Sequence, residues 1–482
     1  MIENMFIGRE GEFSRLDQCM NEESPQLVVV YGRRRVGKTF LINRYYDGRF
    51  DFKLTGSFNA KKEDQLQDFI DELNRHTGEK QERPETWREA FNLLRSYLDE
   101  LPENEKHVVF FDEMPWMDTR NSGFLQAFEH FWNDYGCTLN NLVFIVCGSA
   151  TSWIQKKIAE NKGGLFNRQT CTLYLKPFNL YETMQYLKTR GIEWEQYDIA
   201  ECYMILGGIP YYLSLLRPDM SLSQNIDNLF FRKRAELWDE FDHLYRTLFT
   251  NSRQYIHLVE VLSRKRSGLT RSELVNEPDI PNNGTLTEML SDLEASGFIR
   301  ACSYYGKKKQ ETRYQLSDYY SLFFFRFLKD FPGREEHFWS HGYDNPARSV
   351  WAGLTFEQLC RDHILQIKNK LGISGVLAEE SSWFSKADDE RGIEKGAQID
   401  LLIDRRDHVI NICEIKYSTR EFLIDSDYSK VLRNKVETFR AATETKKTLA
   451  LTMITTYGVM QNKYSGMVNN QVVLEDLFRQ TK

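Results

Sequence analysis

The chain has 482 residues, of which 41% are hydrophobic and 28% are charged, and its formal net charge at pH 7 is −7. This length suggests about three domains with enough apolar material for their cores. The negative charge excludes a chain that is basic throughout, so any contact with nucleic acid must come from local patches. The eight cysteines contain no C-x-x-C pair, and the sequence has no run of about 18 apolar residues. We therefore expect a cytoplasmic protein with reduced thiols, without a zinc site and without membrane contact.

The first informative segment follows an apolar run at residues 27–31 and leads into the apolar start of a helix. It fits the phosphate-binding pattern G-x-x-x-x-G-K-[ST], whose glycines let backbone N–H groups converge on phosphates at a helix start. Lys38 would contact the β- and γ-phosphates of a nucleotide, and the Thr39 hydroxyl would bind Mg²⁺. The alternative is a chance match in a glycine turn. The residues expected around the nucleotide are Gly32, Arg33, Arg34, Arg35, Val36, Gly37, Lys38, Thr39 and Phe40.

A second apolar run, at residues 108–111, ends in Asp112 and Glu113. Strands buried on both faces read as continuous apolar sequence, and ligands of open α/β sheets gather at the carboxyl ends of the strands. Asp112 is therefore predicted to hold Mg²⁺. Glu113 is predicted to act as the general base that polarises the attacking water. The alternative is an acidic pair that merely ends a strand.

The segments up to residue 176 alternate apolar strands with helical patterns, which predicts a parallel α/β sheet as the core of a P-loop ATPase. A third strand, at residues 142–147, is followed by Ser149, a residue placed to sense the γ-phosphate. Helix capping by Ser149 or Thr151 is an equal alternative. A fourth strand is expected at residues 172–175. Residues 177–240 are predicted to form a helical lid, interrupted by glycines and a proline at 207–210.

Residues 241–330 show the order of a winged helix-turn-helix. A turn at 281–284 precedes a helix at 285–296, and two strands near 298–302 and 312–316 enclose a basic tip at Lys307, Lys308 and Lys309. This order predicts DNA contact by the helix and the tip. The alternative is a winged helix that only packs between domains. The helix carries Glu288, Asp292 and Glu294 and no lysine or arginine, which argues against specific reading of bases.

A second centre is predicted in residues 340–482, where a strand at 398–403 turns back into a strand at 409–416. Such a hairpin brings Asp400 near Glu414, and the two-residue period places Glu414 and Lys416 on the same face. The two acids are predicted to bind Mg²⁺, while Lys416 orients water or stabilises negative charge on a phosphodiester. Glu357, on a preceding helix, is a further candidate metal ligand. The alternative is a hairpin held by salt bridges.

Together these segments resemble a known family, the prokaryotic AAA+-like ATPases of the STAND group with a C-terminal nuclease-like domain, which are common in archaea and some bacteria. The resemblance covers nearly the full chain. It rests on the phosphate loop and on Phe6-Ile7-Gly8-Arg9-Glu10, Asp112-Glu113, Gly207-Gly208-Ile209-Pro210 and Tyr314-Gln315-Leu316-Ser317-Asp318.

The resemblance implies roles that the residues alone do not show. Residues Phe6 to Arg9 would flank the adenine, and Arg168 would act as an arginine finger supplied by a neighbouring copy. The tail resembles the PD-(D/E)xK phosphodiesterase fold, an α/β fold of the restriction-endonuclease type. Its three signature positions are occupied by Asp400, Glu414 and Lys416.

The leading hypothesis is an ATPase switch that uses ATP and Mg²⁺ to control a C-terminal domain that binds and cuts nucleic acid, with DNA as the expected substrate. Several copies would assemble if Arg168 acts between subunits. One alternative is a nucleotide-gated regulator or scaffold whose nuclease-like tail does not catalyse. Another is control of transcription through the winged helix.

Overall fold

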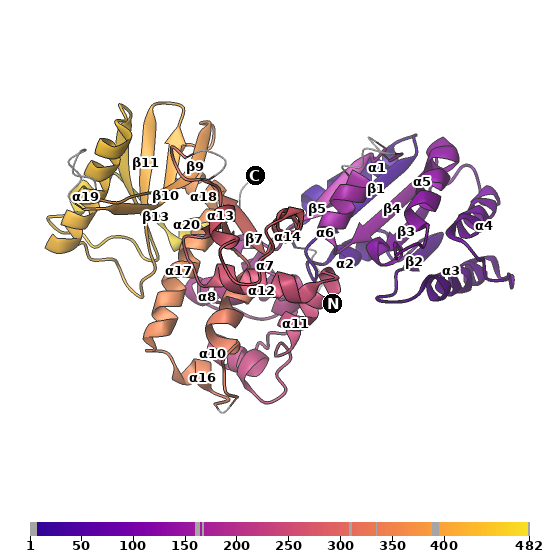
Figure 1. Ribbon diagram of the computed structural model, residues 1–482, viewed down its shortest axis with the longest axis horizontal. Helices are drawn as coiled ribbons and strands as arrows, with labels where there is room; N and C mark the ends of the chain where they lie inside the picture. The colour runs from indigo at the N-terminus through magenta and orange to yellow at the C-terminus, as the bar shows by residue number, and fades with distance from the viewer. Residues whose placement is uncertain are drawn as a thin grey trace.

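The computed structural model describes residues 7–159, 164–165, 168–307, 311–333, 335–387 and 395–480. A parallel sheet lies at one end of the molecule and a mixed C-terminal sheet lies at the other (Figure 1). Helices and a small three-stranded unit fill the space between the two sheets. The division of the chain into four domains stays a prediction, because the bounds of the elements alone do not fix where one domain ends.

The parallel sheet has the strand order β2-β3-β4-β1-β5, and every pair of neighbouring strands is parallel. The strands predicted at 27–31, 108–111, 142–147 and 172–175 are all present. β2 was not predicted, because four residues ending in an exposed threonine give no clear pattern. The elements are α1 (Glu10–Asn21), β1 (Gln26–Gly32), α2 (Lys38–Tyr45), β2 (Phe52–Thr55), α3 (Lys62–Thr77), α4 (Trp87–Asp99), β3 (His107–Asp112), η1 (Met114–Trp116), α5 (Phe124–Asp134), η2 (Gly136–Thr138), β4 (Leu142–Gly148), α6 (Thr151–Ile154), η3 (Gln155–Ala159) and β5 (Cys171–Leu175).

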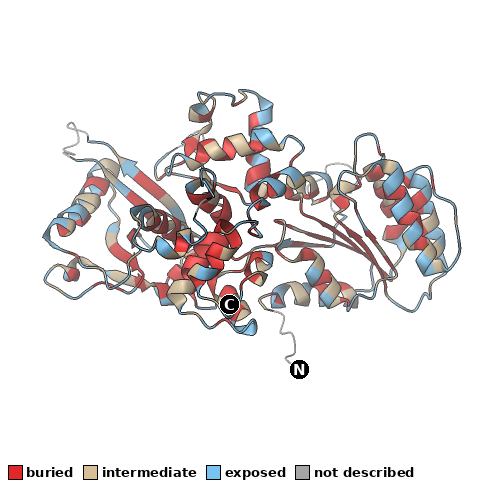
Figure 2. Cartoon of the chain, turned by 90° about the horizontal axis from the view of Figure 1, so that it is seen from below, coloured by how far each residue is buried: buried red, intermediate tan, exposed pale blue. Residues whose placement is uncertain are grey.

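Side chains of the inner strand β1 alternate between two hydrophobic clusters, one on each face of the sheet. Leu27 and Val29 pack in the cluster that contains the residues of α3, α4 and α5. Val28 and Val30 pack in the cluster that continues into the middle of the molecule. The strands are therefore buried along most of their length (Figure 2), which explains why they read as continuous apolar runs.

The helices after β5 occupy the region predicted as the lid, 177–240, and the start of the segment after it. Gly207 and Gly208 both have positive φ, and Pro210 begins the next helix, so the glycine and proline motif ends one helix and starts another. The Gly208 carbonyl accepts a hydrogen bond of 2.9 Å from Phe178 N–H. The elements are α7 (Leu180–Thr189), α8 (Gln196–Leu206), α9 (Pro210–Ser214), α10 (Leu222–Ile226), η4 (Asp227–Phe231) and α11 (Glu240–Leu248).

The three-stranded unit, residues 252–316, has the strand order β6-β8-β7 with antiparallel pairs. It contains the predicted second helix and both predicted strands, whereas its identity as a winged helix stays a prediction. Lys308 and Lys309 lie outside the described residues. The elements of this unit and of the segment after it are α12 (Ser252–Ser263), β6 (Leu269–Thr270), α13 (Arg271–Leu274), α14 (Gly284–Ala295), β7 (Ile299–Cys302), β8 (Arg313–Leu316), α15 (Tyr319–Phe323), η6 (Phe324–Leu328) and α16 (Phe338–His341).

The C-terminal sheet has the strand order β13-β12-β11-β10-β9. The predicted hairpin is present as the antiparallel pair β10 and β11, and α19 connects β11 to its parallel neighbour β12. None of the helices in the described part of the chain is long and apolar enough to cross a membrane. The elements are α17 (Pro346–Asp362), α18 (Ile364–Lys370), β9 (Ala378–Ser385), β10 (Ala397–Arg405), β11 (Val409–Lys416), α19 (Ser426–Thr443), β12 (Thr448–Thr455), η8 (Ser465–Met467), β13 (Asn470–Val473) and α20 (Leu474–Leu477).

The close approach at Gly208 gives a test of this packing. A Cβ on Gly208 would lie 2.2 Å from the Phe178 carbonyl oxygen, whereas a Cβ on Gly191, which also has positive φ, meets nothing nearer than 4.0 Å. We expect G208A to be less stable than G191A by about 1–3 kcal/mol, because only G208A adds overpacking to the backbone strain. Urea unfolding of both variants measures the difference, and equal losses would contradict the packing described here.

Candidate functional sites

The phosphate loop connects β1 to α2 at the carboxyl edge of the parallel sheet. Gly37 lies directly before α2 with a φ of 90°, a conformation that residues with a side chain rarely adopt. Lys38 is 5% exposed, and its Nζ donates hydrogen bonds of 3.0 Å to the carbonyl oxygens of Gly32 and Arg33. The ammonium group is thus held over the loop, where it would neutralise the phosphates of a nucleotide.

Thr39 and Asp112 form the candidate magnesium site. β4 separates the strands that lead to them, and the parallel direction brings both residues to the same edge of the sheet. Thr39 Oγ1 donates a hydrogen bond of 2.8 Å to Asp112 Oδ2. Mg²⁺ prefers oxygen ligands and is usually held by one or two protein groups together with substrate phosphates. A hydroxyl and a carboxylate in contact fit the predicted ion.

Glu113, the predicted general base, is held by Ser149, the predicted phosphate sensor. The Ser149 N–H and Oγ donate hydrogen bonds of 3.0 and 2.8 Å to Glu113 Oε2. Glu113 also has a φ of 47°, and such outliers in non-glycine residues cluster at functional sites. The capping alternative is wrong, because no side-chain hydrogen bond caps α6, whose N-cap residue is Ala150. The predicted general base and the predicted phosphate sensor therefore contact each other.

The segment predicted beside the adenine is only partly described, because Phe6 lies outside the described residues. Arg9 is 6% exposed, and its Nη2 donates a hydrogen bond of 2.8 Å to the carbonyl of Lys176, directly after β5. The Arg9 guanidinium also lies 5.2 Å from the centre of the Phe178 ring. Phe40, on α2, is 63% exposed. Arg9 thus fixes the segment before α1 against the start of the lid.

Arg168 is exposed and lies three residues before β5. β5 runs parallel to β1, with Leu175 opposite Gly32 of the phosphate loop. Arg168 is therefore beyond the amino end of its strand, at the edge of the sheet opposite the loop of its own chain. Its role as an arginine finger toward a neighbouring copy stays a prediction.

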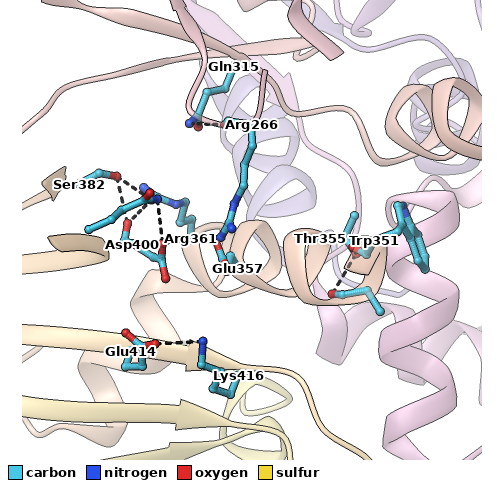
Figure 3. Close-up of polar contacts among 12 residues, drawn as sticks. Arg266, Gln315, Trp351, Thr355, Glu357, Arg361, Ser382, Asp400, Glu414 and Lys416 are labelled. Carbon is cyan, nitrogen blue, oxygen red and sulfur yellow. Dashed lines mark hydrogen bonds and ion pairs between the residues drawn. The ribbon is translucent and has the colours of Figure 1, made fainter. Parts of the chain in front are cut away.

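The acidic centre, which we define as Glu357, Asp400 and Glu414, lies where α17 approaches the hairpin of β10 and β11 (Figure 3). The pairing of Leu401 with Cys413 places Asp400 and Glu414 at the next positions of the two strands, as predicted. On the other side of β10, the register with β9 shifts between Ile399 and Leu402. Asp400 thus lies at a strand irregularity. Such irregularities change the direction of side chains and are frequent next to functional sites.

Glu414 is 2% exposed and has three partners within the protein. Its carboxylate accepts hydrogen bonds of 2.5 Å from Tyr428 OH and 2.5 Å from Lys435 Nζ, and Lys416 Nζ is 3.0 Å away. Burial raises the pKa of Glu414, but the charges of Lys435 and Lys416 outweigh burial, so the pKa lies below its ordinary value. Glu414 is thus ionised and fully paired.

Glu357 and Asp400 are bridged by Arg266, which comes from the segment between α12 and β6. Arg266 forms an ion pair with Glu357, and its Nη2 is 3.6 Å from Asp400 Oδ1. Burial and the charge of Asp400 raise the pKa of Glu357, while Arg266 opposes them. Within the described residues, no group of three or more His, Cys, Asp or Glu side chains is arranged to hold a metal ion. The Arg266 guanidinium thus lies between two acids of the acidic centre. In this arrangement the acidic centre does not fit a metal ion.

Comparisons with known proteins match the N-terminal part of the chain to a family and find relatives over shorter and longer stretches. Residues 6–216 match a family model described as an ATPase domain predominantly from Archaea. An uncharacterized protein of Methanocaldococcus jannaschii is 23% identical over 436 residues, 89% of this chain and 91% of that protein. An uncharacterized ATP-binding protein of the same organism is 42% identical over 45 residues, 9% of this chain and 76% of that protein. A solved Walker-type ATPase of Pyrococcus abyssi is 16% identical with a TM-score of 0.48, covering 67% of this chain and 97% of that one.

The N-terminal part of the chain is a P-loop ATPase domain of archaeal type. This confirms the coarser part of the resemblance, and such a domain implies ATP as its ligand. The winged-helix and nuclease-like identities stay predictions.

Arg33 ties the phosphate loop of the ATPase domain to the three-stranded unit and to the segment directly after it. The Arg33 side chain forms an ion pair with Asp318, and both side chains are less than 10% exposed. Its guanidinium also lies 4.8 Å from the centre of the Phe298 ring. Burial would lower the pKa of Arg33, but Asp318 outweighs burial and raises it, so the side chain stays charged. Asp318 in turn caps α15 through hydrogen bonds from Ser321.

The other two arginines of the loop also contact protein. Arg35 forms an ion pair of 2.6 Å with the buried Glu240 at the start of α11 and lies 4.0 Å from the Tyr211 ring. Arg34 lies 5.7 Å from the Trp116 ring. The sequence had placed these residues around the nucleotide. Because the side chains of Arg33 and Arg35 are committed to protein contacts, their backbone amides are the groups left for phosphates.

The helix predicted to contact DNA, and the hairpin that carries the predicted basic tip, both contact other parts of the chain. On α14, Asp292 and Glu288 lie 2.7 and 3.8 Å from Lys156 Nζ of the ATPase domain. In the hairpin of β7 and β8, Tyr305 N–H donates a hydrogen bond of 2.8 Å to the Ser382 carbonyl of β9. These contacts favour the alternative in which the unit packs between domains.

The protein partners of the acids and of the Asp400 strand in the second centre were not found from the sequence. Arg266 belongs to the basic run 264–266, which reads as an ordinary exposed charge cluster. Arg361 donates hydrogen bonds to the Asp400 carbonyl and to Ser382 Oγ. Lys435 lies two helical turns after Tyr428, so helical periodicity would have shown that these two partners of Glu414 share one face of α19.

The contact between Arg33 and Asp318 predicts the behaviour of a variant, D318N. Asparagine keeps an oxygen for the cap of α15 but leaves the buried guanidinium without a counter-ion. We expect D318N to lower the free energy of unfolding by about 3–5 kcal/mol. D219N, in the exposed pair of Asp219 with Arg217, should change it by about 1 kcal/mol or less.

Urea unfolding measures both variants, and the double variant R33M/D318N should recover most of the loss because it removes the unpaired charge as well. Similar stabilities for D318N and D219N would show that the buried pair does not restrain the loop.

Proposed function

We propose that this protein is an ATP-driven switch. Binding and hydrolysis of ATP reposition the helical lid (177–240) and the winged helix-turn-helix (241–330), and thereby control a nuclease-like domain (340–482) that acts on nucleic acid, with DNA as the preferred candidate. The observation that carries the proposal is the contact of Arg33 with Asp318, because together with the contact of Arg33 with Phe298 it links the phosphate loop to the unit that reaches the C-terminal sheet.

The chemistry of the ATPase domain follows from the residues at the sheet edge. Lys38 exchanges its hydrogen bonds with loop carbonyls for the phosphates of ATP. Thr39 and Asp112 hold Mg²⁺, which neutralises charge on the phosphates when it is bound. Glu113 accepts a proton from the attacking water, and Ser149 orients its carboxylate.

Turnover is proposed to need a second copy of the chain. Arg168 is exposed and far from its own loop, so it is placed to serve a neighbour. An arginine supplied in this way raises phosphoryl-transfer rates by about 10³–10⁵. An isolated copy would therefore bind ATP and hydrolyse it slowly.

The ATP site is tested with K38A. Loss of the ammonium should weaken ATP binding by about 10- to 100-fold, which is the effect of removing a charged hydrogen bond. K188A, which removes an exposed lysine of α7, should bind ATP like the unaltered protein. Calorimetric titration with ATP and a phosphate-release assay measure both effects, and normal binding by K38A would refute the site.

The C-terminal function is tested by a cleavage assay on single- and double-stranded DNA and RNA with Mg²⁺ or Mn²⁺, with and without ATP. Asp400, Glu414 and Lys416 are the residues we assign to cleavage. D400N and K416M should lose about 100-fold or more of the activity, whereas K430M, on an exposed turn of α19, should keep it.

A regulator or scaffold without cleavage is the second candidate. It is favoured by the paired state of Glu414 and by the position of Arg266 between the other two acids. Absence of cleavage on every substrate would support it. Transcription control through the winged helix predicts a defined DNA footprint that persists after deletion of residues 340–482, and loss of that footprint would count against it.

A further inference from the structure

The acidic centre already contains its own cation. Arg266 pairs with Glu357 and lies 3.6 Å from Asp400, while Lys416 and Lys435 pair with Glu414. Figure 3 shows the Arg266 side chain descending onto Glu357 from the three-stranded unit, beside Asp400. Every acid of the centre therefore has a positive partner from the protein.

The Arg266 guanidinium and a divalent metal ion would compete for the carboxylates of Glu357 and Asp400. Two carboxylates that share a partly buried site repel each other unless a positive charge lies near both. Arg266 supplies that charge here. A metal ion would need the same oxygens of Glu357 and Asp400 as ligands, and it would be repelled by the guanidinium if both were present.

The residues around Arg266 also disfavour entry of a divalent metal ion. Arg266 lines a cavity of about 450 Å³ between the three-stranded unit and the C-terminal sheet. Positive side chains outnumber negative ones on its walls, which disfavours the approach of a free divalent cation to the acids. The other cationic residues of this cavity are Arg264, Lys265, Arg300, Arg326 and Arg361.

We propose that Arg266 is an internal plug that keeps the acidic centre closed to divalent metal ions, and that the centre binds metal only after Arg266 has withdrawn. This inference rests on the proposed role of the acidic centre in metal-dependent cleavage. In this view the structure represents the closed state of the acidic centre, in which Arg266 occupies the place of the metal ion.

Withdrawal of Arg266 requires no unfolding. The Arg266 side chain is 47% exposed, and it belongs to the connection between α12 and β6 rather than to a core element. Its neighbours Arg264 and Lys265 have side chains that are 59% and 45% exposed. Rotation of the side chain toward solvent therefore separates it from both acids while the backbone stays in place.

The test is binding of Mn²⁺ in the absence of nucleotide, followed by the electron paramagnetic resonance signal of free Mn²⁺. R266A should bind one Mn²⁺ at least about tenfold more tightly than the unaltered protein, because the competing charge is gone. R266A/D400N should lose this site. R266K, which keeps the charge, and R217A, which removes an exposed arginine that is paired with Asp219 and lies outside this cavity, should bind like the unaltered protein.

Each other outcome is decisive. Binding by R266A that is no tighter than that of the unaltered protein, or a gain that persists in R266A/D400N, would overturn the plug. Tight binding by the unaltered protein that D400N abolishes would also overturn it, while leaving the metal centre of the proposed function intact. If no variant binds Mn²⁺ the plug is refuted, and the cleavage assay decides the proposed function separately. If R266A does not fold, as judged from its melting curve, R266Q is measured instead.

Discussion

The buried ion pair of Arg33 and Asp318 is the interaction on which the rest of the structure depends. Removing a guanidinium from water costs several kcal/mol unless a counter-ion and hydrogen bonds replace the solvent. Asp318 provides this replacement and at the same time caps α15. The phosphate loop therefore cannot shift by itself without separating buried charges. Its position is specified jointly by residues that are 285 positions apart in the sequence.

The three-stranded unit connects the region of this ion pair to the C-terminal sheet. Phe298 packs against Arg33, and Asp292 of α14 pairs with Lys156 of the ATPase domain. From the same unit, Arg266 extends into the acidic centre and the hairpin pairs with β9. The unit thus contacts both ends of the molecule, which agrees with its central place in Figure 1. Such a junction is what a switch needs, because a change at one sheet must move something that the other sheet also contacts.

Sequence patterns predicted the parts whose signal is local. The phosphate loop, the strand ending in Asp112 and the hairpin carrying Asp400 and Glu414 each occupy a short segment with a clear period, and the structure contains all three. Contacts between distant segments could not be predicted in this way. In the sequence Arg33 looks like a nucleotide contact and Arg266 like an ordinary surface arginine, because a buried ion pair depends on a partner that no local pattern identifies. The same reason explains why the acids were assigned to metal and the loop arginines to the nucleotide.

The contact of Tyr304 and Tyr305 with Ser382 has a further consequence for the C-terminal sheet. β9 is an outer strand, and this hairpin shields part of its free side, where Phe384 packs against Tyr304. Uncovered outer strands invite pairing with strands of other molecules. A fragment that begins after residue 316 would therefore present a bare backbone edge with an aromatic ring beside it, and it would self-associate. The hairpin thus protects the edge of the sheet that follows it from pairing with other molecules.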